Sequence, residues 1–246
     1  MLSLAGKRAF VTGASRGIGA AIARYLAADG AAVAIGYERS ASQAEELVSQ
    51  ITAAGGRAVA IQMNAAEPAS VRQAVDLAAS SLGGLDILVN NAGIFRAGPV
   101  DELTLDDIDT TLAVNVRAVM VASQAALAYM GEGGRIISTG SNLAERVPGE
   151  GASLYAASKA ALIGWTKGIA RDLGPRGITA NVVHPGSTDT DMNPADSPRA
   201  DGQRERMAIK RYGQADDIAA LVAFVASPAA RFITGTGLTV DGGANA

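Results

Sequence analysis

The chain of 246 residues contains no cysteine, one histidine and one tryptophan. Without cysteine it can form neither a disulfide framework nor a thiolate metal site. The single imidazole, that of His184, argues against a histidine-rich metal site and leaves only one candidate base for a Ser-His-Asp triad. We therefore predict that the protein binds no metal.

Long apolar runs and strong charge are also missing. No run approaches the ~18 apolar residues that a membrane span needs, and the start "MLSLAGKRAF" lacks the apolar core and cleavage site of a signal peptide. The net charge of −3 and the pI near 5.2 give no general attraction to nucleic acid. We expect a cytoplasmic globular protein that binds neither membranes nor nucleic acid.

Short apolar runs alternate with longer amphipathic stretches along the whole chain. This alternation predicts βαβ units, and hence a single α/β domain over 1–246 with a doubly wound, parallel, seven-stranded sheet and helices on both faces. The expected strands are 8–12, 31–37, 57–62, 86–90, 135–139, 179–184 and 237–240. The expected helices are 17–29, 41–54, 68–82, 104–130, 153–173 and 215–226.

One stretch breaks this pattern, "STDTDMNPADSPRADGQRERM" at 187–207. Its proline, aspartate and serine content predicts a mobile loop that carries a short helix. Loops of this length within a compact domain tend to be functional, so we expect a substrate lid at about 187–210.

A glycine-rich turn, "TGASRGIG", follows the first expected strand and precedes a helix. Gly13, Gly17 and Gly19 permit a tight turn and a close approach of the backbone to a pyrophosphate, and the helix would point its amide donors at that group. An ordinary strand-to-helix turn is the alternative. The position between strand and helix favours dinucleotide binding.

The end of the second expected strand, "GYERS", indicates which nucleotide is bound. NAD-selective sites place a carboxylate there, to bind the ribose hydroxyls. Here Tyr37 occupies that position, while Arg39 and Arg16 could hold a 2′-phosphate. Glu38 would oppose that anion, and both arginines could simply be solvated. We favour NADP(H) over NAD(H).

The stretch "SLYAASKAALIGW" predicts an amphipathic helix that carries Tyr155 and Lys159 four residues apart. At that spacing the phenol and the amine lie on one helical face, close enough to touch. A surface pair with snorkelling stems is the alternative.

Several motifs together resemble those of the short-chain dehydrogenase/reductase family, in its ~250-residue branch. They occur in one order over the whole chain: "TGASRGIG", "NNAG" at 90–93, Asn115 in "LAVNVRA", Ser141 in "RIISTGS", "YAASK" with Tyr155 and Lys159, and "PG" at 185–186. The combined set is specific to that family, although no single member is.

The resemblance implies a role for each catalytic candidate. Tyr155 would be the general acid in reduction or the base in oxidation, and Lys159 would lower the pKa of Tyr155 and bind the nicotinamide ribose. Ser141 would steady the substrate oxygen, and Asn115 would hold a water that relays protons to Lys159. Alternatively, Asn115 is a buried, satisfied amide and Ser141 a turn residue.

One spacing departs from the family pattern. Ser141 and Tyr155 differ by fourteen positions, whereas the family commonly has thirteen, which Asn142 would satisfy. The pattern "GRIISTGS" still aligns Ser141, so we keep it as the catalytic serine. Asn64 departs as well, because it stands where the family usually has an aspartate near the adenine.

The resemblance also implies two larger sets of residues. The cofactor site would comprise Gly13, Ser15, Arg16, Gly17, Ile18, Gly19, Tyr37, Arg39, Asn64, Asn91, Ala92, Gly93, Tyr155, Lys159, Pro185, Gly186, Thr188 and Thr190. The substrate walls would comprise Ile94, Phe95, Asn142, Leu143, Val147, Gly186 and Met192, which are mostly apolar and uncharged. His184 we interpret as a packed imidazole rather than a catalytic one.

Two classes of function remain open. The set of Asn115, Ser141, Tyr155 and Lys159 favours a reductase for a neutral, fairly hydrophobic ketone. The second half of the chain is also similar to bacterial family members that bind cyclic-di-GMP and are linked to biofilm dispersal, which suggests a nucleotide-binding protein. A 3-oxoacyl-carrier-protein reductase is disfavoured because Glu132 stands where that group has a cation.

The resemblance also implies an oligomeric state. The family is usually homotetrameric, paired through 104–130 and 153–173.

Overall fold

The sheet predicted from the sequence is confirmed. The computed structural model describes residues 4–246, so residues 1–3 of the predicted domain lie outside the described residues. All seven strands are parallel, in the order β3-β2-β1-β4-β5-β6-β7. The strands are β1 (Arg8–Val11), β2 (Ala32–Tyr37), β3 (Arg57–Gln62), β4 (Ile87–Asn90), β5 (Arg135–Thr139), β6 (Thr179–Pro185) and β7 (Gly237–Val240).

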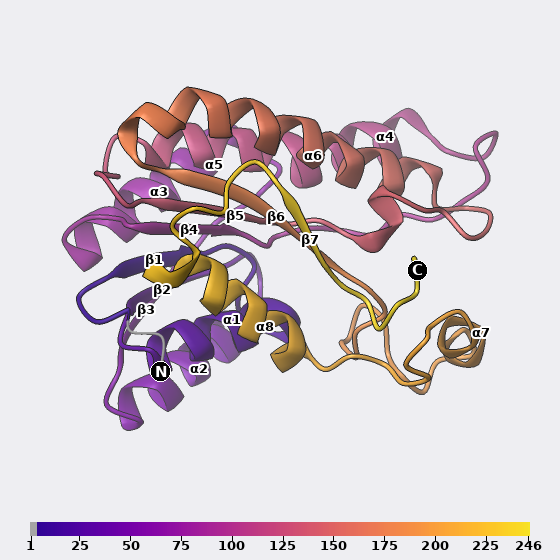
Figure 1. The fold of residues 1–246 in the computed structure, drawn as a ribbon, viewed down its shortest axis with the longest axis horizontal. Helices are drawn as coiled ribbons and strands as arrows, with labels where there is room; N and C mark the ends of the chain where they lie inside the picture. The colour runs from indigo at the N-terminus through magenta and orange to yellow at the C-terminus, as the bar shows by residue number, and fades with distance from the viewer. Residues whose placement is uncertain (1–3) are drawn as a thin grey trace.

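Helices cover both faces of the sheet (Figure 1). On one face, α1 (Gly17–Ala28), α2 (Ala41–Ala53) and α8 (Ala215–Ala226) enclose a core of small and branched side chains. On the other, α3 (Pro68–Leu82), α5 (Ala118–Ala126) and α6 (Ser153–Leu173) enclose a second core. Strands buried on both faces account for the continuous apolar runs in the sequence. Among residues 4–246, no helix combines the length and apolar character needed to cross a membrane.

The expected helix 104–130 is not continuous. It is α4 (Leu105–Leu112), a π-helical turn (Ala113–Arg117) and α5, which ends at Ala126. Thr104 and Asp107 form a reciprocal capping box that fixes the start of α4. Single π-turns inside α-helices are often found at functional sites, and this one carries Asn115.

The strand order locates the candidate site. The order reverses beside β1, whose neighbours are β2 and β4, and ligands of such sheets bind where it reverses, outside the carboxyl ends of the strands. The glycine-rich turn follows β1, the "NNAG" motif follows β4, and Ser141 follows β5. The topology therefore brings the sequence motifs to one edge.

The expected lid segment contains the predicted short helix, α7 (Ala200–Glu205). It lies beyond the sheet edge near the C-terminal end of the chain (Figure 1). Ala200, Met207 and Tyr212 form a small cluster of their own, with Ala195 and Ala244 packed against it. Asn193 and Gln203 also exchange side-chain hydrogen bonds of 3.2 and 3.3 Å. The segment is therefore internally bonded as well as irregular.

Candidate active site

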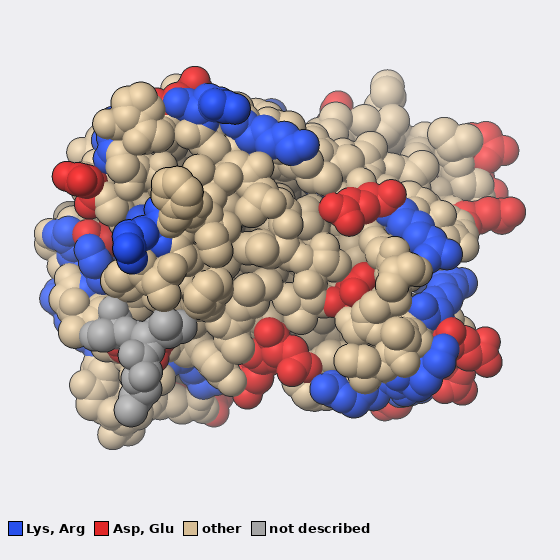
Figure 2. Space-filling model, in the orientation of Figure 1, with Lys and Arg blue, Asp and Glu red and all other residues tan. Residues whose placement is uncertain are grey.

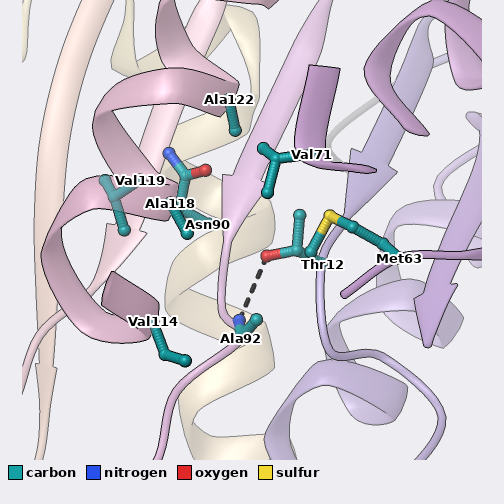
Figure 3. A pocket seen from close by; sticks show the side chains of 9 residues that line it. All are labelled: Thr12, Met63, Val71, Asn90, Ala92, Val114, Ala118, Val119 and Ala122. Carbon is teal, nitrogen blue, oxygen red and sulfur yellow. Dashed lines mark hydrogen bonds between the residues drawn. The ribbon is translucent and has the colours of Figure 1, made fainter. Parts of the chain in front are cut away.

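Hydrogen bonds join the loop after β1 to the loop after β4. The Thr12 hydroxyl accepts from the backbone amides of Asn91 (3.0 Å) and Ala92 (3.1 Å). In return, the Asn91 side chain donates to the carbonyls of Thr12 (3.1 Å) and Gly13 (2.9 Å). Figure 3 shows the Thr12 hydroxyl directed at Ala92, beside a small cavity of about 10 Å³ that Asn90 and Val114 also line.

The glycines of the turn are required by this junction. At Gly13, where φ is +63°, a Cβ would lie 2.7 Å from the Cα of Ala92. At Gly19 a Cβ would lie 2.5 Å from the Nδ2 of Asn91. Both contacts are too short for any side chain, so the two loops could not close. No side chain caps the N-terminus of α1 at Arg16, which leaves its amide donors and dipole directed at the site.

Both candidate cations for a 2′-phosphate are paired with carboxylates. The Arg16 Nη1 lies 2.9 Å from the Asp191 Oδ2, and the Arg39 Nε lies 3.3 Å from the Glu38 Oε1. All four side chains are at least half exposed, so these ion pairs are weak and exchangeable. The residues present thus fit a phosphorylated dinucleotide. The uncapped amides of α1 and the glycine-rich turn suit the pyrophosphate, and Arg16 and Arg39 suit a phosphate on the ribose.

An open groove of about 660 Å³ adjoins Arg39. Glu38, Gln62 and Asn64 line it together with residues of α3. The Asn64 Oδ1 accepts from the backbone amide of Ala66 (2.9 Å), which turns the chain at the end of β3. Asn64 therefore stands at the groove with its oxygen engaged, while its amide nitrogen is the group it would offer to an adenine.

Tyr155 and Lys159 meet as their spacing predicts. The Lys159 Nζ lies 5.8 Å from the centre of the Tyr155 ring and donates to the carbonyl of Thr139 (2.8 Å). The Tyr155 ring also makes an edge contact with Phe95, with centroids 4.9 Å apart. Lys159 is only 4% exposed, so the surface-pair interpretation is wrong.

Burial dominates the protonation of this pair. It lowers the pKa of Lys159 to about 8. It raises the pKa of Tyr155, although a hydrogen bond with Ser141 acts in the opposite direction. The expectation that Lys159 lowers the pKa of Tyr155 is therefore not met. The phenol keeps its proton at neutral pH, as a proton donor must.

Ser141 lies against Tyr155, directly after β5. It is 6% exposed, its hydroxyl accepts from the backbone amide of Leu143 (3.1 Å), and its proximity lowers the pKa of Tyr155. Asn142, which the family spacing would select, begins the short 3-10 helix Asn142–Ala144, and its carbonyl accepts from the Asn245 side chain (2.7 Å). The geometry favours Ser141 over Asn142.

Asn115 lies inside the protein, with no exposed surface. Its Oδ1 accepts from the backbone amide of Ile94 (2.9 Å), and its Nδ2 donates to the carbonyl of Ile94 (3.0 Å) and to the Ser158 hydroxyl (3.0 Å). A Cβ on Gly93 would lie 3.3 Å from the Asn115 Oδ1 and 3.4 Å from the Lys159 Nζ. Asn115 is a satisfied amide, and it also adjoins the amine.

The remaining cofactor candidates lie at the end of β6. Gly186 must be glycine because a Cβ there would lie 2.5 Å from the Cα of Asp241. The buried Thr188 donates to the Gly186 carbonyl (3.1 Å). Thr190 closes against the glycine-rich turn, with its Cγ2 3.4 Å from where a Cβ of Gly17 would be. The segment after β6 therefore borders the turn after β1.

The expected substrate walls are only partly assembled. Phe95 touches Tyr155, Ile94 is held by Asn115, and Leu143 is held by Ser141. Val147 and Met192 are 47% and 59% exposed, so neither is packed into a wall.

Sequence reasoning missed two residues at this site. Asp191 pairs with Arg16 across 175 positions, and Asn245 binds the carbonyl of Asn142 across 103. Neither belongs to a motif, and no local pattern predicts contacts of such separation. Among residues 4–246, no group of three or more His, Asp or Glu side chains is placed to hold a metal ion.

The chain is similar to proteins of known sequence and structure over nearly its whole length. A family model described as enoyl-(acyl carrier protein) reductase matches residues 13–245. A short-chain dehydrogenase from Burkholderia cenocepacia J2315, solved in complex with NADP, is 72% identical, with 99% of each chain covered and a TM-score of 0.98. A blue fluorescent protein from a metagenomic library, in complex with NADPH, is 58% identical, with a TM-score of 0.98 over 99% of this chain and 100% of that one. The cyclic-di-GMP-binding biofilm dispersal mediator protein of Escherichia coli (strain K12) is 46% identical over 98% of both chains.

Proposed function

Because this chain belongs to the short-chain dehydrogenase/reductase family, we propose that it is an NADP(H)-dependent oxidoreductase that interconverts a neutral ketone and its secondary alcohol. One observation carries the proposal: the buried Lys159 amine lies 5.8 Å from the centre of the Tyr155 ring, burial raises the pKa of the phenol, and Ser141 lies near enough to lower it. A general acid needs this combination of a retained proton and a fixed position.

Each residue of the site has a separate task in the proposed reduction. The Tyr155 hydroxyl donates its proton to the substrate oxygen, and the Ser141 hydroxyl holds that oxygen in place. Lys159 binds the nicotinamide ribose. Asn115 fixes the Ile94 backbone beside Lys159 and adjoins the route by which protons would return to the amine. The bound nicotinamide supplies the hydride in reduction and accepts it in oxidation.

The N-terminus of α1 and the glycine-rich turn would hold the pyrophosphate, and Arg16 and Arg39 the 2′-phosphate. Two structural neighbours, 72% and 58% identical, contain NADP and NADPH, which supports the same choice here. Tyr37, in place of a carboxylate, removes the usual ligand of an unphosphorylated ribose. Pro185, Gly186, Thr188 and Thr190 would border the nicotinamide.

We expect Asp191 to restrain NADPH binding because it competes with the 2′-phosphate for Arg16. Asp191→Asn should tighten NADPH binding about two- to fivefold, the range that one exposed ion pair allows, and change NADH binding little. Arg16→Ala should weaken NADPH binding selectively. Fluorescence titration of both nucleotides measures these effects, with Asp196→Asn, exposed in the same segment, as the control. Equal effects on NADH and NADPH would contradict the assignment.

The substrate is proposed to be neutral and fairly hydrophobic. Phe95 contacts the Tyr155 ring, Ile94 is bonded to Asn115 and Leu143 to Ser141, and none of the three carries charge. The 187–210 segment would close over it as a lid and exclude water. Tight binding of a carboxylated substrate would refute this class.

A reductase for carrier-bound acyl chains is the nearer alternative, and the description of the matching family model names carrier protein. Two features disfavour it here. Glu132 places negative charge on the route of an anionic partner. Arg176, which stands near the turn before β6 where such reductases present a second basic residue, is engaged within the chain, because it donates to the carbonyls of Leu127 (3.0 Å) and Met130 (2.8 Å).

A nucleotide-binding protein is the alternative from another class, supported by the 46% identity to a cyclic-di-GMP-binding protein. A panel of neutral ketones with NADPH, followed by its near-ultraviolet absorbance, separates the two. Turnover that is lost in Tyr155→Phe supports the reductase. Absence of turnover with every ketone, together with tight cyclic-di-GMP binding that survives Tyr155→Phe, favours the binding protein.

The protein is also proposed to assemble as a homotetramer, paired through α4, α5 and α6. Leu105 and Leu112 of α4 are 78% and 41% exposed, which leaves apolar surface on that helix. Figure 2 shows a second broad area with few charged side chains over β7 and α8, whereas charged side chains of both signs gather near α7. Light scattering should give the mass of four chains, and a monomer would contradict the proposal.

A further inference from the structure

His184, the single histidine, lies in β6, and its ring contacts the backbone of Ser141. Its ring has no exposed surface. The Nδ1 lies 2.8 Å from the carbonyl oxygen of Ser141 and 3.2 Å from its amide nitrogen. Two backbone atoms of Ser141 thus lie within hydrogen-bonding distance of one ring nitrogen. The imidazole is therefore hydrogen-bonded to the backbone of the residue that carries the serine hydroxyl.

Two glycines confine the ring. A Cβ on Gly140 would lie 2.5 Å from the Nδ1, and a Cβ on Gly237 would lie 2.8 Å from the Nε2. Gly140 directly precedes Ser141, and Gly237 begins β7. Side chains at either position would displace the ring, and with both absent the imidazole is held between β5 and β7.

The hydrogen bonds also determine where the ring proton lies. The Nε2 is buried without a hydrogen-bond partner among residues 4–246. A buried donor without a partner is disfavoured more than a buried acceptor without one. The shorter contact is the one to the Ser141 carbonyl. The proton therefore belongs on Nδ1, which donates to that carbonyl.

The ring has no means of acting on a substrate directly. Burial lowers its pKa, and Lys159 acts in the same direction, against the Ser141 backbone bond and Glu145, which raise it. The imidazole is therefore neutral at physiological pH, and it contacts the chain's own backbone at Ser141, directly after β5.

We propose that His184 is a positioning residue that holds the Ser141 peptide, so that the serine hydroxyl faces Tyr155. The inference rests on the proposed reductase function, in which Ser141 holds the substrate oxygen. Displacement of a reacting group by about 1 Å can slow a reaction by about 100-fold. The competing interpretation is that the ring only fills space in the core.

Two replacements separate these interpretations. His184→Leu fills a similar volume and removes the donor, whereas His184→Asn places an amide where the Nδ1 stood and can bond the carbonyl again. Val183→Ala is the control, because Val183 is the neighbouring residue of β6, is fully buried, and packs in the core on the other face of the sheet.

We expect His184→Leu to lower kcat for ketone reduction by about 10- to 100-fold, with KM and NADPH affinity little changed. His184→Asn should recover most of that loss. The alkaline limb of the kcat profile should move to higher pH in His184→Leu, because the Ser141 bond that lowers the pKa of Tyr155 is loosened. If His184→Leu merely lowers Tm as Val183→Ala does, with kcat and pH profile unchanged, the ring is packing only.

A second set of measurements, which forms the second arm of the test, does not depend on turnover. With one histidine in the chain, its ¹⁵N resonances need no assignment, and they should report the Nδ1–H tautomer without titration across neutral pH. Ultraviolet titration of Tyr155, taken as the difference from Tyr155→Phe, should shift upward in His184→Leu. The Nε2–H tautomer or an unshifted phenol overturns the inference. Failure of the reductase function alone would appear as no turnover in the wild type, with this arm unaffected.

Discussion

Replacing Tyr155 with phenylalanine is expected to reduce ketone turnover by about 10²- to 10⁴-fold, the usual contribution of a positioned general acid. The substitution removes one oxygen and retains the ring that packs at 4.9 Å against Phe95. KM and NADPH affinity should change little, because the lost interaction is one made with the reacting oxygen.

The chain offers a matched control for this substitution. Tyr129 is partly exposed, and its hydroxyl donates to Asp76 (2.8 Å), away from the site. Tyr129→Phe removes the same atom and should leave kcat unchanged. Steady-state kinetics with NADPH measures both variants. Turnover by Tyr155→Phe at the wild-type rate would assign the acid to another group.

Replacing Lys159 with methionine is expected to abolish turnover and to stabilise the fold. The amine is almost fully buried, and its one hydrogen bond is to the Thr139 carbonyl. No ion pair within residues 4–246 includes it. A buried charge without a counter-ion opposes folding, whereas methionine has a similar length and no charge.

The direction of the pH dependence follows from the lowered pKa. In the unfolded chain the amine titrates near 10.5, and in the folded protein at about 8. Between these values the unfolded state binds more protons, so the free energy of unfolding rises with pH. The full difference corresponds to about 3 kcal/mol as an upper limit, and it acts against the folded state below pH 8.

Thermal unfolding at several pH values tests this expectation. Lys159→Met should have a higher Tm than the wild type at pH 7, and the advantage should shrink as the pH rises from 8 toward 10.5. Lys167→Met, on the exposed face of the same helix, should change Tm little at any pH. A lower Tm for Lys159→Met at pH 7 would show that the contacts of the amine stabilise the fold by more than its desolvation destabilises it.

The sheet and the site motifs were predictable because they are local. Each strand is an apolar run with turn residues at its ends, and the glycine-rich turn lies directly after the first of them. Parallel strands place their carboxyl ends at one edge, which brings "NNAG", after β4, and Ser141, after β5, together. Their meeting follows from topology rather than from any feature of the individual residues.

Contacts between distant segments were not predictable. Arg16 was expected to bind a phosphate, and its ion pair with Asp191 depends on how the segment after β6 folds back. The direction of the Tyr155 pKa was also wrong, because the i, i+4 spacing reveals the neighbouring cation but not the depth of burial. Burial is a property of the whole fold, and here it raises the pKa of Tyr155 by more than Ser141 lowers it.

The π-turn Ala113–Arg117 is equivalent to a regular α-helix into which one extra residue has been inserted. Deleting a single residue from it would let α4 and α5 join as one uninterrupted α-helix. Each residue of such a helix advances by about 100°, so a deletion before Asn115 would swing its amide away from Ile94 and Ser158. The site thus depends on the length of this segment as well as on the identity of its residues, and a change that improves helix regularity should remove function.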